Sequence, residues 1–572
     1  LITLDFETYY SKEYSLGKLT TEEYIRDPRF EVIGIGIKVN NQETEWASGT
    51  HEELKKYLQT FDWEKSMVLA HNTMFDGAIL NWVFNISPRV YTDTLCISRG
   101  VHGVETSSSL KALVENYDIG AKGTEVFEAI GKRREDFTES ELEKYGDYCI
   151  NDVDLTYKLF MLMARGFPKK EFKLIDTTLR MFVEPVLDLD LGMLEQHLTE
   201  TRDSKDELLT ASGVSKEDLM SNPKFAEVLK SIGVEPPMKI SPTTGKETFA
   251  FAKSDEEFKA LQTHSDERVQ ALVNARLGTK STLEETRTQR FIDIAKRGLL
   301  PVPVKYYAAH TGRWGGDDKI NLQNLPSRGV NGKKLKRSII APEGYTIIDA
   351  DSSQIEARVL AWLAEQDDLT EAFTNGEDVY VKMASRIYDK AEEDITKDER
   401  FVGKTTILGA GYGMGALKFQ SQLKTFGFDM AIEEARRVIK IYRETNCNDM
   451  PFSLGRDRVL VTVPEENAIK LPSGLLMRYG DLDYDQGEQG IEFHYQTRRG
   501  RTRIYGGKVI ENVCQAIARC IIGEQMLLIN KKHRVVLTVH DSIAACVKDE
   551  EVKQAQTYIE ECMKWTPDWA GG

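Results

Sequence analysis

Two aspartates lie where apolar, strand-like runs give way to polar residues. Residues 345–351 end the first run at Asp351, and residues 535–541 end the second at Asp541. A carboxylate at the end of a buried strand is costly unless it binds a cation. Two such carboxylates brought together would bind a pair of Mg²⁺ ions, the arrangement used for in-line phosphoryl transfer. The sequence therefore predicts a two-metal site made by Asp351 and Asp541.

A basic, helix-like segment, residues 400–413, lies between these two runs. Arg400 and Lys404 are about one helical turn apart and supply positive charge suited to a triphosphate. Leu408 and Tyr412 continue the spacing of four, so all four side chains are expected along one side of a helix.

The end of this segment contains three glycines, Gly409, Gly411 and Gly413. Each costs about 1 kcal/mol inside a helix compared with alanine. An amphipathic surface helix would not explain three of them. We interpret them as positions where the backbone closely approaches another group or bends.

A second set of acids lies near the N-terminus. Asp5 and Glu7 are two residues apart in the opening strand, so their side chains leave the same face. Asp76 ends an Asn-x₃-Asp element after another apolar run, and Tyr148 and Asp152 share one face of an expected helix. Four carboxylates from three segments would repel one another without cations, which predicts two divalent metals. Any one acid alone would more ordinarily be a helix cap or a surface charge.

These segments resemble known families. The stretches around Asp351, Lys404 and Asp541 resemble motifs A, B and C of family A DNA polymerases, the bacterial DNA polymerase I group. The N-terminal acids resemble the DEDDy class of 3′→5′ proofreading exonucleases over about residues 1–165, and Asp93 is assigned a structural role there. The resemblance implies an α/β multi-domain protein in which an RNase H-like exonuclease domain precedes a right-hand polymerase. The implied divisions are exonuclease 1–170, thumb 171–300, palm 301–365 and 451–572, and fingers 366–450.

The resemblance also implies roles for single residues. Asp351 would bridge both polymerase metals, with Asp349 only its neighbour, and His540 would approach the primer terminus. Tyr412 would stack near the templating base. Tyr148 would orient the water that attacks in the exonuclease.

Arg313 and Gln515 would contact the minor groove of the newly made pair, where acceptors are similar in all correct pairs. A structural ion pair is the alternative for Arg313. The sequence Ser353-Gln-Ile-Glu356 also leaves two roles open. Glu356 completes a helix capping box, or, as the resemblance implies, closes the space near the sugar 2′ position and excludes ribonucleotides, or does both.

Two positions depart from the family pattern. Position 408 is usually Phe or Tyr, and without a ring hydroxyl Leu408 predicts discrimination against chain-terminating 3′-deoxy nucleotides. Position 542 is usually Glu, so Ser542 removes one carboxylate from the metal neighbourhood and leaves Asp541 as the principal ligand.

Composition limits these interpretations only weakly. The 572 residues carry a formal net charge of −16, but DNA binding needs only a local basic track. Candidate tracks are residues 332–337 and residues 498–503 with Lys508, and solvated surface loops are the alternative for each. Seven scattered cysteines disfavour a disulfide framework or zinc ribbon, and no apolar run predicts a membrane span. A long exposed helix is expected from Arg276 onward.

We therefore predict a template-directed DNA polymerase with 3′→5′ proofreading, using two Mg²⁺ ions per active site, with Mn²⁺ as a substitute. Its partners would be primer–template DNA, deoxynucleoside triphosphates and accessory proteins such as a helicase, clamp or single-strand-binding protein. The sequence resembles bacteriophage versions, which favours the cytoplasm of an infected bacterium over an organellar matrix. Two alternatives stay open: a nuclease whose C-terminal half only binds DNA, and a non-catalytic replication scaffold.

Overall fold

The computed structural model describes residues 1–123, 129–241, 244–253, 255–325, 329–445, 460–487 and 490–570. The predicted fingers–palm boundary at 450 and 451 lies outside these ranges. The described chain forms two compact units, one of residues 1–187, 301–324 and 341–572, and one of residues 188–300 and 325–340. No described helix is both long enough and apolar enough to cross a membrane. The six cysteines among the described residues are free and buried.

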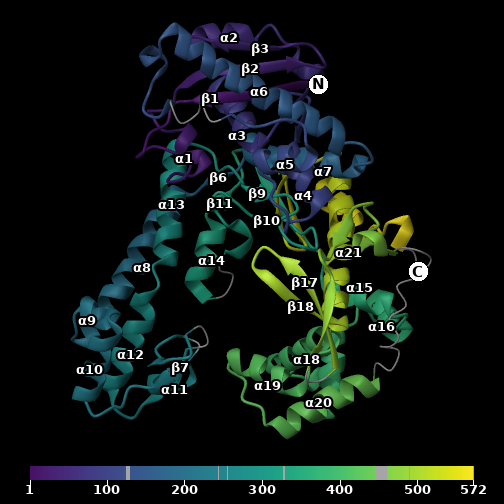
Figure 1. Ribbon diagram of the computed structural model, residues 1–572. Helices are drawn as coiled ribbons and strands as arrows, with labels where there is room; N and C mark the ends of the chain where they lie inside the picture. The colour runs from purple at the N-terminus through teal and green to yellow at the C-terminus, as the bar shows by residue number, and fades with distance from the viewer. Residues whose placement is uncertain are drawn as a thin grey trace. The chain divides into compact units, whose positions relative to one another are not determined.

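The N-terminal part of the first unit is built on a five-stranded mixed sheet with the order β3-β2-β1-β4-β5 (Figure 1). Strands β1, β2 and β3 are antiparallel, whereas β4 and β5 run parallel to β1. Long helix α6 packs against β1, β2 and β3. The strands are β1 Ile2–Thr8, β2 Val32–Val39, β3 Thr44–Ser48, β4 Met67–Ala70 and β5 Val90–Asp93. The helices are α2 His51–Leu58, α3 Thr73–Ala78, α4 Thr94–His102, α5 Leu110–Tyr117, α6 Glu139–Met163 and α7 Lys169–Val183.

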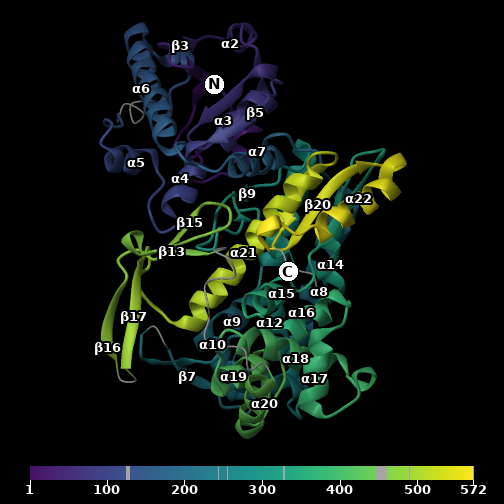
Figure 2. The same ribbon diagram turned by 90° about the vertical axis from the view of Figure 1, so that its right-hand side faces the viewer.

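The C-terminal part of the first unit contains a three-stranded antiparallel sheet with the order β12-β20-β19. Helices α21 and α22 pack against this sheet, and Figure 2 shows both beside β20. The strands are β12 Tyr345–Asp351, β19 Arg534–Val539 and β20 Ser542–Lys548. The helices are α15 Ile355–Leu363, α21 Gly506–Ile529 and α22 Val552–Lys564. The sequence prediction of strands ending at Asp351 and before Asp541 is confirmed.

A helical cluster follows α15 and has a core of its own around Tyr380, Phe419 and Tyr442. Its helices are α16 Asp367–Thr374, α17 Val379–Tyr388, α18 Lys397–Ala410, α19 Ala416–Thr425 and α20 Ile432–Thr445. Two small antiparallel sheets come before α21. Their strands are β13 Val461–Val463, β14 Ala468–Lys470, β15 Leu476–Arg478, β16 Asp483–Gly487, β17 Gly490–Thr497 and β18 Gly500–Ile504.

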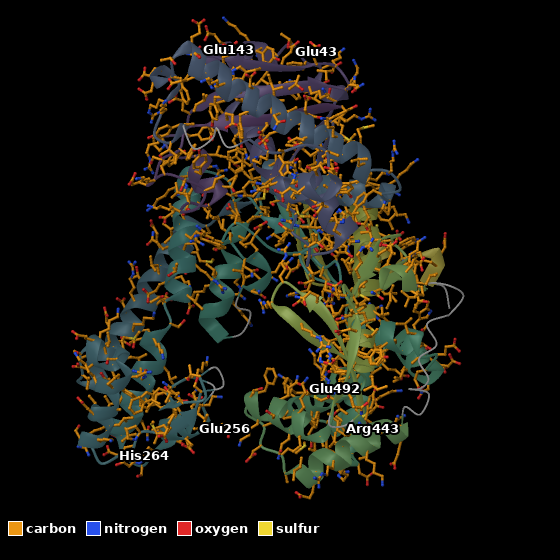
Figure 3. All side chains as sticks on the ribbon, viewed as in Figure 1. Glu43, Glu143, Glu256, His264, Arg443 and Glu492 are labelled. Atoms are coloured by element: carbon orange, nitrogen blue, oxygen red, sulfur yellow. The ribbon has the colours of Figure 1, made fainter. Side chains whose placement is uncertain are left out.

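The sheet β16-β17-β18 carries arginines that pair with acids of the same sheet. Arg501 pairs with Asp483 and Asp485, and Arg503 pairs with Glu492 at 2.9 Å (Figure 3 labels Glu492). The predicted basic track at residues 498–503 is therefore partly neutralised by acids of its own sheet.

The second unit is mostly helical and has a separate core around Phe225, Phe251 and Phe258. Its helices are α8 Leu191–Ser212, α9 Lys216–Met220, α10 Asn222–Ser231, α11 Glu256–Ala260, α12 Glu267–Lys280, α13 Leu283–Arg297 and α14 Gly329–Arg337. Two short strand pairs complete it, β6 Asp188–Leu189 with β11 Ile339–Ile340, and β7 Met238–Ile240 with β8 Glu247–Phe249.

The prediction of a long exposed helix from Arg276 is wrong. Helix α12 ends at Lys280, and the Arg276 side chain is fully buried, with its guanidinium 4.5 Å from the ring centroid of Phe225. A cation–π contact of this kind lets an arginine enter an aromatic core, which charge patterning along the sequence does not reveal. The five predicted domain divisions stay predictions.

Candidate active sites

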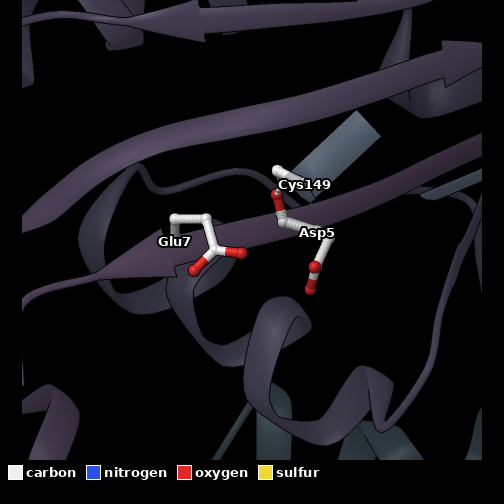
Figure 4. Close-up of side chains that lie close together, drawn as sticks. All are labelled: Asp5, Glu7 and Cys149. Atoms are coloured by element: carbon white, nitrogen blue, oxygen red, sulfur yellow. Dashed lines mark hydrogen bonds between the residues drawn. The ribbon is translucent and has the colours of Figure 1, made fainter. Parts of the chain in front are cut away.

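The four N-terminal acids meet at one end of the five-stranded sheet. Asp5 and Glu7 lie on β1, Asp76 on α3 and Asp152 on α6 (Figure 4 shows Asp5 and Glu7). The Phe6 N–H donates to Asp76 Oδ1 at 3.0 Å, which ties α3 to β1. Glu7, Asp76 and Asp152 are buried. The structure thus brings together the carboxylates that the sequence predicted would meet.

Burial and mutual repulsion disfavour the charged forms of these acids. Burial, followed by the charges of its acidic neighbours, raises the pKa of Asp5 well above its usual range. Burial raises the pKa of Glu7 to about 7 and that of Asp76 to about 8. Mg²⁺ prefers oxygen ligands such as carboxylates, and a bound cation would favour the charged forms that burial disfavours. The residues present therefore fit a divalent metal site.

Two residues that the sequence analysis did not predict contact this cluster. Lys122 donates to Asp152 and lies 5.3 Å from the ring centroid of Tyr148, and Tyr145 donates to Glu7. Tyr145 precedes Tyr148 by three residues on α6, so helical spacing could have found it. Lys122 comes from a loop and gives no such signal.

Cys149 also lies within 4.8 Å of ligand atoms of Asp5 and Glu7. Its thiol points to the Asp5 carbonyl oxygen at 3.4 Å, and burial raises its pKa well above the usual range. The thiol is thus engaged with a backbone oxygen, and Mg²⁺ prefers oxygen ligands to sulfur. We therefore leave Cys149 out of the ligand set. Asp93 has the structural role assigned to it, because its carboxylate accepts the N–H of Asn72, which precedes α3, and the N–H of Leu95 in the first turn of α4.

We expect the stability of the protein without divalent metal to fall as the pH rises. In the folded protein the pKa values of Glu7 and Asp76 lie above the values of 4.5 and 3.8 that these side chains have when unfolded. Their contribution is therefore fully present below about pH 4 and is lost as the pH rises toward about 7 to 8. Denaturation in EDTA between pH 5 and 8.5 measures this loss. Added Mg²⁺ should reduce it, and equal slopes for the protein and its Asp76→Asn variant in EDTA would contradict the assignment.

The second predicted acid pair meets at the ends of neighbouring strands. Strand β12 pairs with β20 so that Asp351 faces Ser542, and Asp541 lies in the turn between β19 and β20. The Ser352 N–H donates to the Asp541 carbonyl oxygen at 2.9 Å. His540 occupies the same turn in a left-handed conformation, with φ +52°. Residues far apart in the sequence are thereby held side by side.

Burial and charged neighbours together set the pKa of Asp541. Burial raises its pKa, the Arg313 guanidinium opposes that rise, and the carboxylates of Glu356 and Asp351 add to it. Arg313 Nη2 lies 3.4 Å from Asp541 Oδ1 and 2.6 Å from Glu356 Oε1. Asp351 is exposed at the end of β12 and Asp541 is half-buried, and their carboxylates offer oxygen ligands suited to Mg²⁺.

Ser542, which departs from the family pattern, contacts another acid. Its hydroxyl donates to the carboxylate of Asp349, which leaves β12 on the same face as Asp351. Residue 542 has no carboxylate of its own, but the carboxylate of Asp349 is hydrogen-bonded to it.

The capping-box interpretation of Glu356 is wrong. Helix α15 is preceded by Gln354 in a left-handed conformation, and no side chain caps it. The Glu356 carboxylate instead accepts from Arg313 at 2.6 Å and from the Tyr412 hydroxyl at 3.3 Å. Arg313 thus forms an ion pair, which was its alternative role, and its partner is Glu356 at the predicted nucleotide site.

Helix α18 carries the basic segment and ends earlier than predicted. Arg400, Lys404 and Leu408 lie on it, whereas Tyr412 lies in the turn after Ala410. Arg400 pairs with Asp378 at 2.6 Å, and the Lys404 ammonium lies 5.9 Å from the ring centroid of Tyr380. Only the first three residues therefore share the predicted helix.

The interpretation of three glycines inside a helix is also corrected. Gly409 is helical, Gly411 follows the last helical residue, and Gly413 has φ +77°. A Cβ on Gly411 would lie 2.6 Å from Leu360 Cδ2. Close packing explains Gly411 and a left-handed turn explains Gly413, so the helix bears less cost than predicted.

Gln515 lies on α21, where its amide donates to Glu511 Oε1 at 3.4 Å. Four residues later, buried Arg519 forms an ion pair with Glu171 of α7 and donates to the Gly312 carbonyl oxygen at 3.0 Å. This network supports the loop that carries Arg313. Charge patterning could not reveal it, because the two partners come from distant helices.

Comparison with known families locates both parts. The profile of "DNA polymerase family A" matches residues 191–448, and that of "3'-5' exonuclease" matches residues 20–166. Together they cover more than half of the chain. The exonuclease match contains Asp76, Tyr148 and Asp152, and the other contains Asp351 and Lys404.

Relatives differ in how much of their length is shared. A DNA polymerase of Bacillus phage SP02 is 23% identical over 99% of this chain and 97% of its own length. DNA polymerase I of Rhizobium leguminosarum is 24% identical over 88% of this chain but only 49% of its own length. The chain thus spans about half of that bacterial relative.

A solved structure shares the fold. It is described as the "POL domain of Pol1 from M. smegmatis complex with DNA primer-template and dNTP", and it is 20% identical with a TM-score of 0.69. The similarity covers 98% of this chain and 91% of that one.

Proposed function

Because the chain belongs to DNA polymerase family A and carries a 3′-5′ exonuclease domain, we propose that it extends a primer along a DNA template and edits the primer end. The observation that carries the proposal is the pairing of β12 with β20, which holds Asp351 beside the turn of Asp541. Two-metal in-line phosphoryl transfer requires acids that can share a pair of metal ions.

Two sets of residues would hold Mg²⁺. Asp351 and Asp541 would do so in the polymerase, and Asp5, Glu7, Asp76 and Asp152 in the exonuclease. Bound Mg²⁺ would neutralise phosphate charge and make the attacking hydroxyl or water easier to deprotonate. Two ions in each site, with Mn²⁺ as a substitute, are part of the proposal.

Residues of α18 would position the incoming nucleotide. Lys404 is exposed, so its ammonium is available to neutralise the leaving pyrophosphate, and Arg400 would add charge at the same end. Tyr412 would stack near the templating base while its hydroxyl holds Glu356. His540 would contact the primer terminus.

Arg313 and Gln515 would donate to minor-groove acceptors of the newly formed pair, which are similar for all correct pairs. The Arg313 guanidinium forms ion pairs with Glu356 and Asp541. A base pair of the wrong shape would displace this guanidinium and so disturb the acids of the polymerase site. Mispairing would thereby slow synthesis.

Tyr148 would orient the attacking water in the exonuclease. Burial, and then the charge of Asp152, raise the pKa of Tyr148, so its phenol keeps its proton. A frayed, mispaired primer end would then reach the N-terminal acids as a single strand and be shortened.

We expect Glu356→Ala to raise the incorporation of ribonucleotides relative to deoxynucleotides about tenfold or more. The mutation removes a carboxylate held at the nucleotide site by Arg313 and Tyr412. Single-turnover incorporation of both nucleotides measures the ratio. Ser353→Ala, which alters the other residue of the excluded capping box, is the matched control. If the ratio of ribonucleotide to deoxynucleotide incorporation in both variants equals that of the wild type, the sugar gate is refuted.

Leu408 should make the enzyme discriminate against 3′-deoxy chain terminators, because leucine has no hydroxyl to replace the missing one. Leu408→Tyr is expected to narrow the difference between terminators and normal nucleotides about tenfold or more. Competition in a primer-extension assay measures it. Leu408→Phe adds the ring without the hydroxyl. If Leu408→Phe increases terminator incorporation as much as Leu408→Tyr does, the hydroxyl is not the cause.

A primer-extension gel with and without deoxynucleotides tests the proposed function as a whole. Growth of the primer with nucleotides and shortening without them are expected. Shortening alone would favour the nuclease alternative, and neither change would favour a replication scaffold.

The proposed setting is DNA replication of a bacteriophage in the cytoplasm of its host. Full-length similarity to a phage polymerase supports it. The proposed divisions are an exonuclease 1–170, thumb 171–300, palm 301–365 and 451–572, and fingers 366–450. A helicase, clamp or single-strand-binding protein would be an accessory partner.

A further inference from the structure

A lysine reaches into the cluster of N-terminal acids. Lys122, in the loop between α5 and α6, donates to Asp152, and its ammonium lies 5.3 Å from the ring centroid of Tyr148. The Lys122 side chain is 30% exposed, whereas that of Asp152 is only 5% exposed. The ammonium thus extends inward from the surface to an acid that is proposed to hold Mg²⁺.

The charge of Lys122 acts on more than one of the acids. Burial and then the acidic neighbours raise the pKa of Asp5, and the Lys122 ammonium opposes that rise. Burial also raises the pKa of Glu7, against the hydrogen bond from Tyr145 and the charge of Lys122. Lys122 is therefore a counter-ion of the cluster, and its effect extends beyond its direct partner Asp152.

A counter-ion and a metal ion compete for the same carboxylate. Mg²⁺ requires oxygen ligands in a nearly octahedral arrangement, which an oxygen engaged with an ammonium meets poorly. Two cations beside one carboxylate also repel each other, most strongly where the surroundings exclude water. A metal that binds Asp152 is therefore weakened by the Lys122 ammonium unless the ammonium moves away.

The place of Lys122 in the chain permits such a move. It lies in a loop, after α5 ends at Tyr117 and before α6 begins at Glu139. Its long side chain carries a compact charge with rotatable donors, which can change partners by rotation about single bonds. The acids instead lie on β1, α3 and α6, where backbone hydrogen bonds hold them in place (Figure 4 shows the two on β1).

Charge balance indicates the second partner of Lys122. Four ionised carboxylates and two Mg²⁺ ions would together be neutral, so the ammonium would leave one positive charge in excess. A phosphodiester carries one negative charge, and lysine binds phosphate as a point charge. The excess therefore matches the phosphodiester that the proposed exonuclease would cut.

We propose that Lys122 is a displaceable counter-ion of the exonuclease site, which competes with the divalent metal for Asp152 and, once displaced, pairs with the phosphodiester to be cut. The inference rests on the proposed exonuclease function and deepens it. It assigns a phosphate-binding role to a loop residue outside the four acids and Tyr148.

Lys38 offers a matched control on the same helix. It pairs with Asp154 of α6 at 2.9 Å, and its ammonium lies 5.5 Å from the ring centroid of Tyr157. Lys38 thus repeats the contacts of Lys122 with an aspartate and a tyrosine of α6. Because Asp154 follows Asp152 by two residues, the two acids leave different sides of the helix.

Metal affinity tests the competition without DNA. Binding of Mn²⁺ is measured by electron paramagnetic resonance at pH 8 for Lys122→Met, Lys38→Met and the chain with both lysines. All three carry Asp351→Ala and Asp541→Ala, which remove the polymerase acids. We expect about fivefold or tighter binding in Lys122→Met alone, because the competing charge is gone. Equal affinity in all three proteins would overturn the competition.

Thermal unfolding gives a readout that a merely structural lysine would not change. A ligand stabilises the folded protein by an amount that rises with its affinity. Mn²⁺ should therefore raise the melting temperature, measured against EDTA, more in Lys122→Met than in the parent protein. An equal rise in both would contradict the inference. Lys122→Gln, which keeps a hydrogen-bond donor but no charge, takes the place of Lys122→Met if that variant does not fold.

Strand cleavage tests the contact with the phosphodiester. At saturating Mg²⁺, Lys122→Met should degrade single-stranded DNA with kcat/KM lowered about tenfold or more, the loss expected for one charged hydrogen bond. Lys122→Arg keeps the charge and should restore most of this loss, and Lys38→Met should match the parent protein. An unchanged kcat/KM in Lys122→Met would overturn the phosphodiester contact.

The two measurements separate this inference from the proposed function. Absent cleavage in every protein, with tighter Mn²⁺ binding in Lys122→Met, would overturn the exonuclease proposal and keep the competition for the metal. Normal cleavage in every protein, with equal Mn²⁺ affinity, would overturn the role of Lys122 and keep the exonuclease.

Discussion

Replacing Asp351 or Asp541 by alanine is expected to lower the rate of nucleotide addition about a thousandfold or more. Each change removes oxygen ligands from the place where β12 and the β19–β20 turn meet. The exonuclease acids belong to another sheet, so shortening of a primer should continue at close to the normal rate. Single-turnover extension and degradation of one labelled primer measure both effects.

Asp349→Ala is the matched control for this prediction, because it removes an acid from the same face of the same strand. Its carboxylate accepts a hydrogen bond from Ser542, where the family has a glutamate. We expect a smaller loss for Asp349→Ala than for Asp351→Ala. Equal losses would contradict the assignment of Asp351 as the principal ligand of β12, and unaltered extension in all three variants would refute the polymerase site.

Sequence patterns were sufficient to predict the acids because strand ends and helical spacing are local. Alternation along β1 placed Asp5 and Glu7 on one face, and helical spacing placed Tyr148 with Asp152. The apolar runs before Asp351 and Asp541 predicted two strands. That these strands pair through β20 depends on tertiary structure, and only the family resemblance indicated it.

The errors have the opposite origin. Ser353 and Glu356 have the spacing of a capping box, but Glu356 binds Arg313 and Tyr412 from other segments. The spacing of four from Arg400 to Tyr412 continues past the end of α18, because Gly411 and Gly413 close the helix. Local rules cannot decide between a local partner and a distant one.

Lys122 and Arg519 show the same limit for charge. Neither residue lies in a motif. Lys122 forms an ion pair with Asp152, a proposed metal ligand, and Arg519, in a buried ion pair with Glu171, donates to the loop that carries Arg313. Breaking one partner of a buried pair leaves an uncompensated charge, so such pairs position a site firmly. Only the fold reveals them.

The combined change of Asp5→Ala and Glu7→Ala is expected to reduce 3′→5′ degradation about a thousandfold or more and to leave primer extension in place. It removes two of the four acids that would hold Mg²⁺ beside the scissile phosphate. Degradation of a mispaired primer in Mg²⁺ measures the loss. Cys149→Ala is the control: its thiol shares the cluster but stays protonated, so degradation should change by only a fewfold.

The same double variant separates a metal site from a merely structural cluster. Burial and acidic neighbours disfavour the charged forms of Asp5 and Glu7. Replacing both residues should therefore stabilise the protein in EDTA at pH 8, where the acids would otherwise be charged. A structural acid behaves oppositely: Asp93 accepts backbone N–H groups, and its loss should destabilise the fold in any buffer. Undiminished degradation, or a double variant less stable in EDTA at pH 8, would show that these acids serve the fold rather than the reaction.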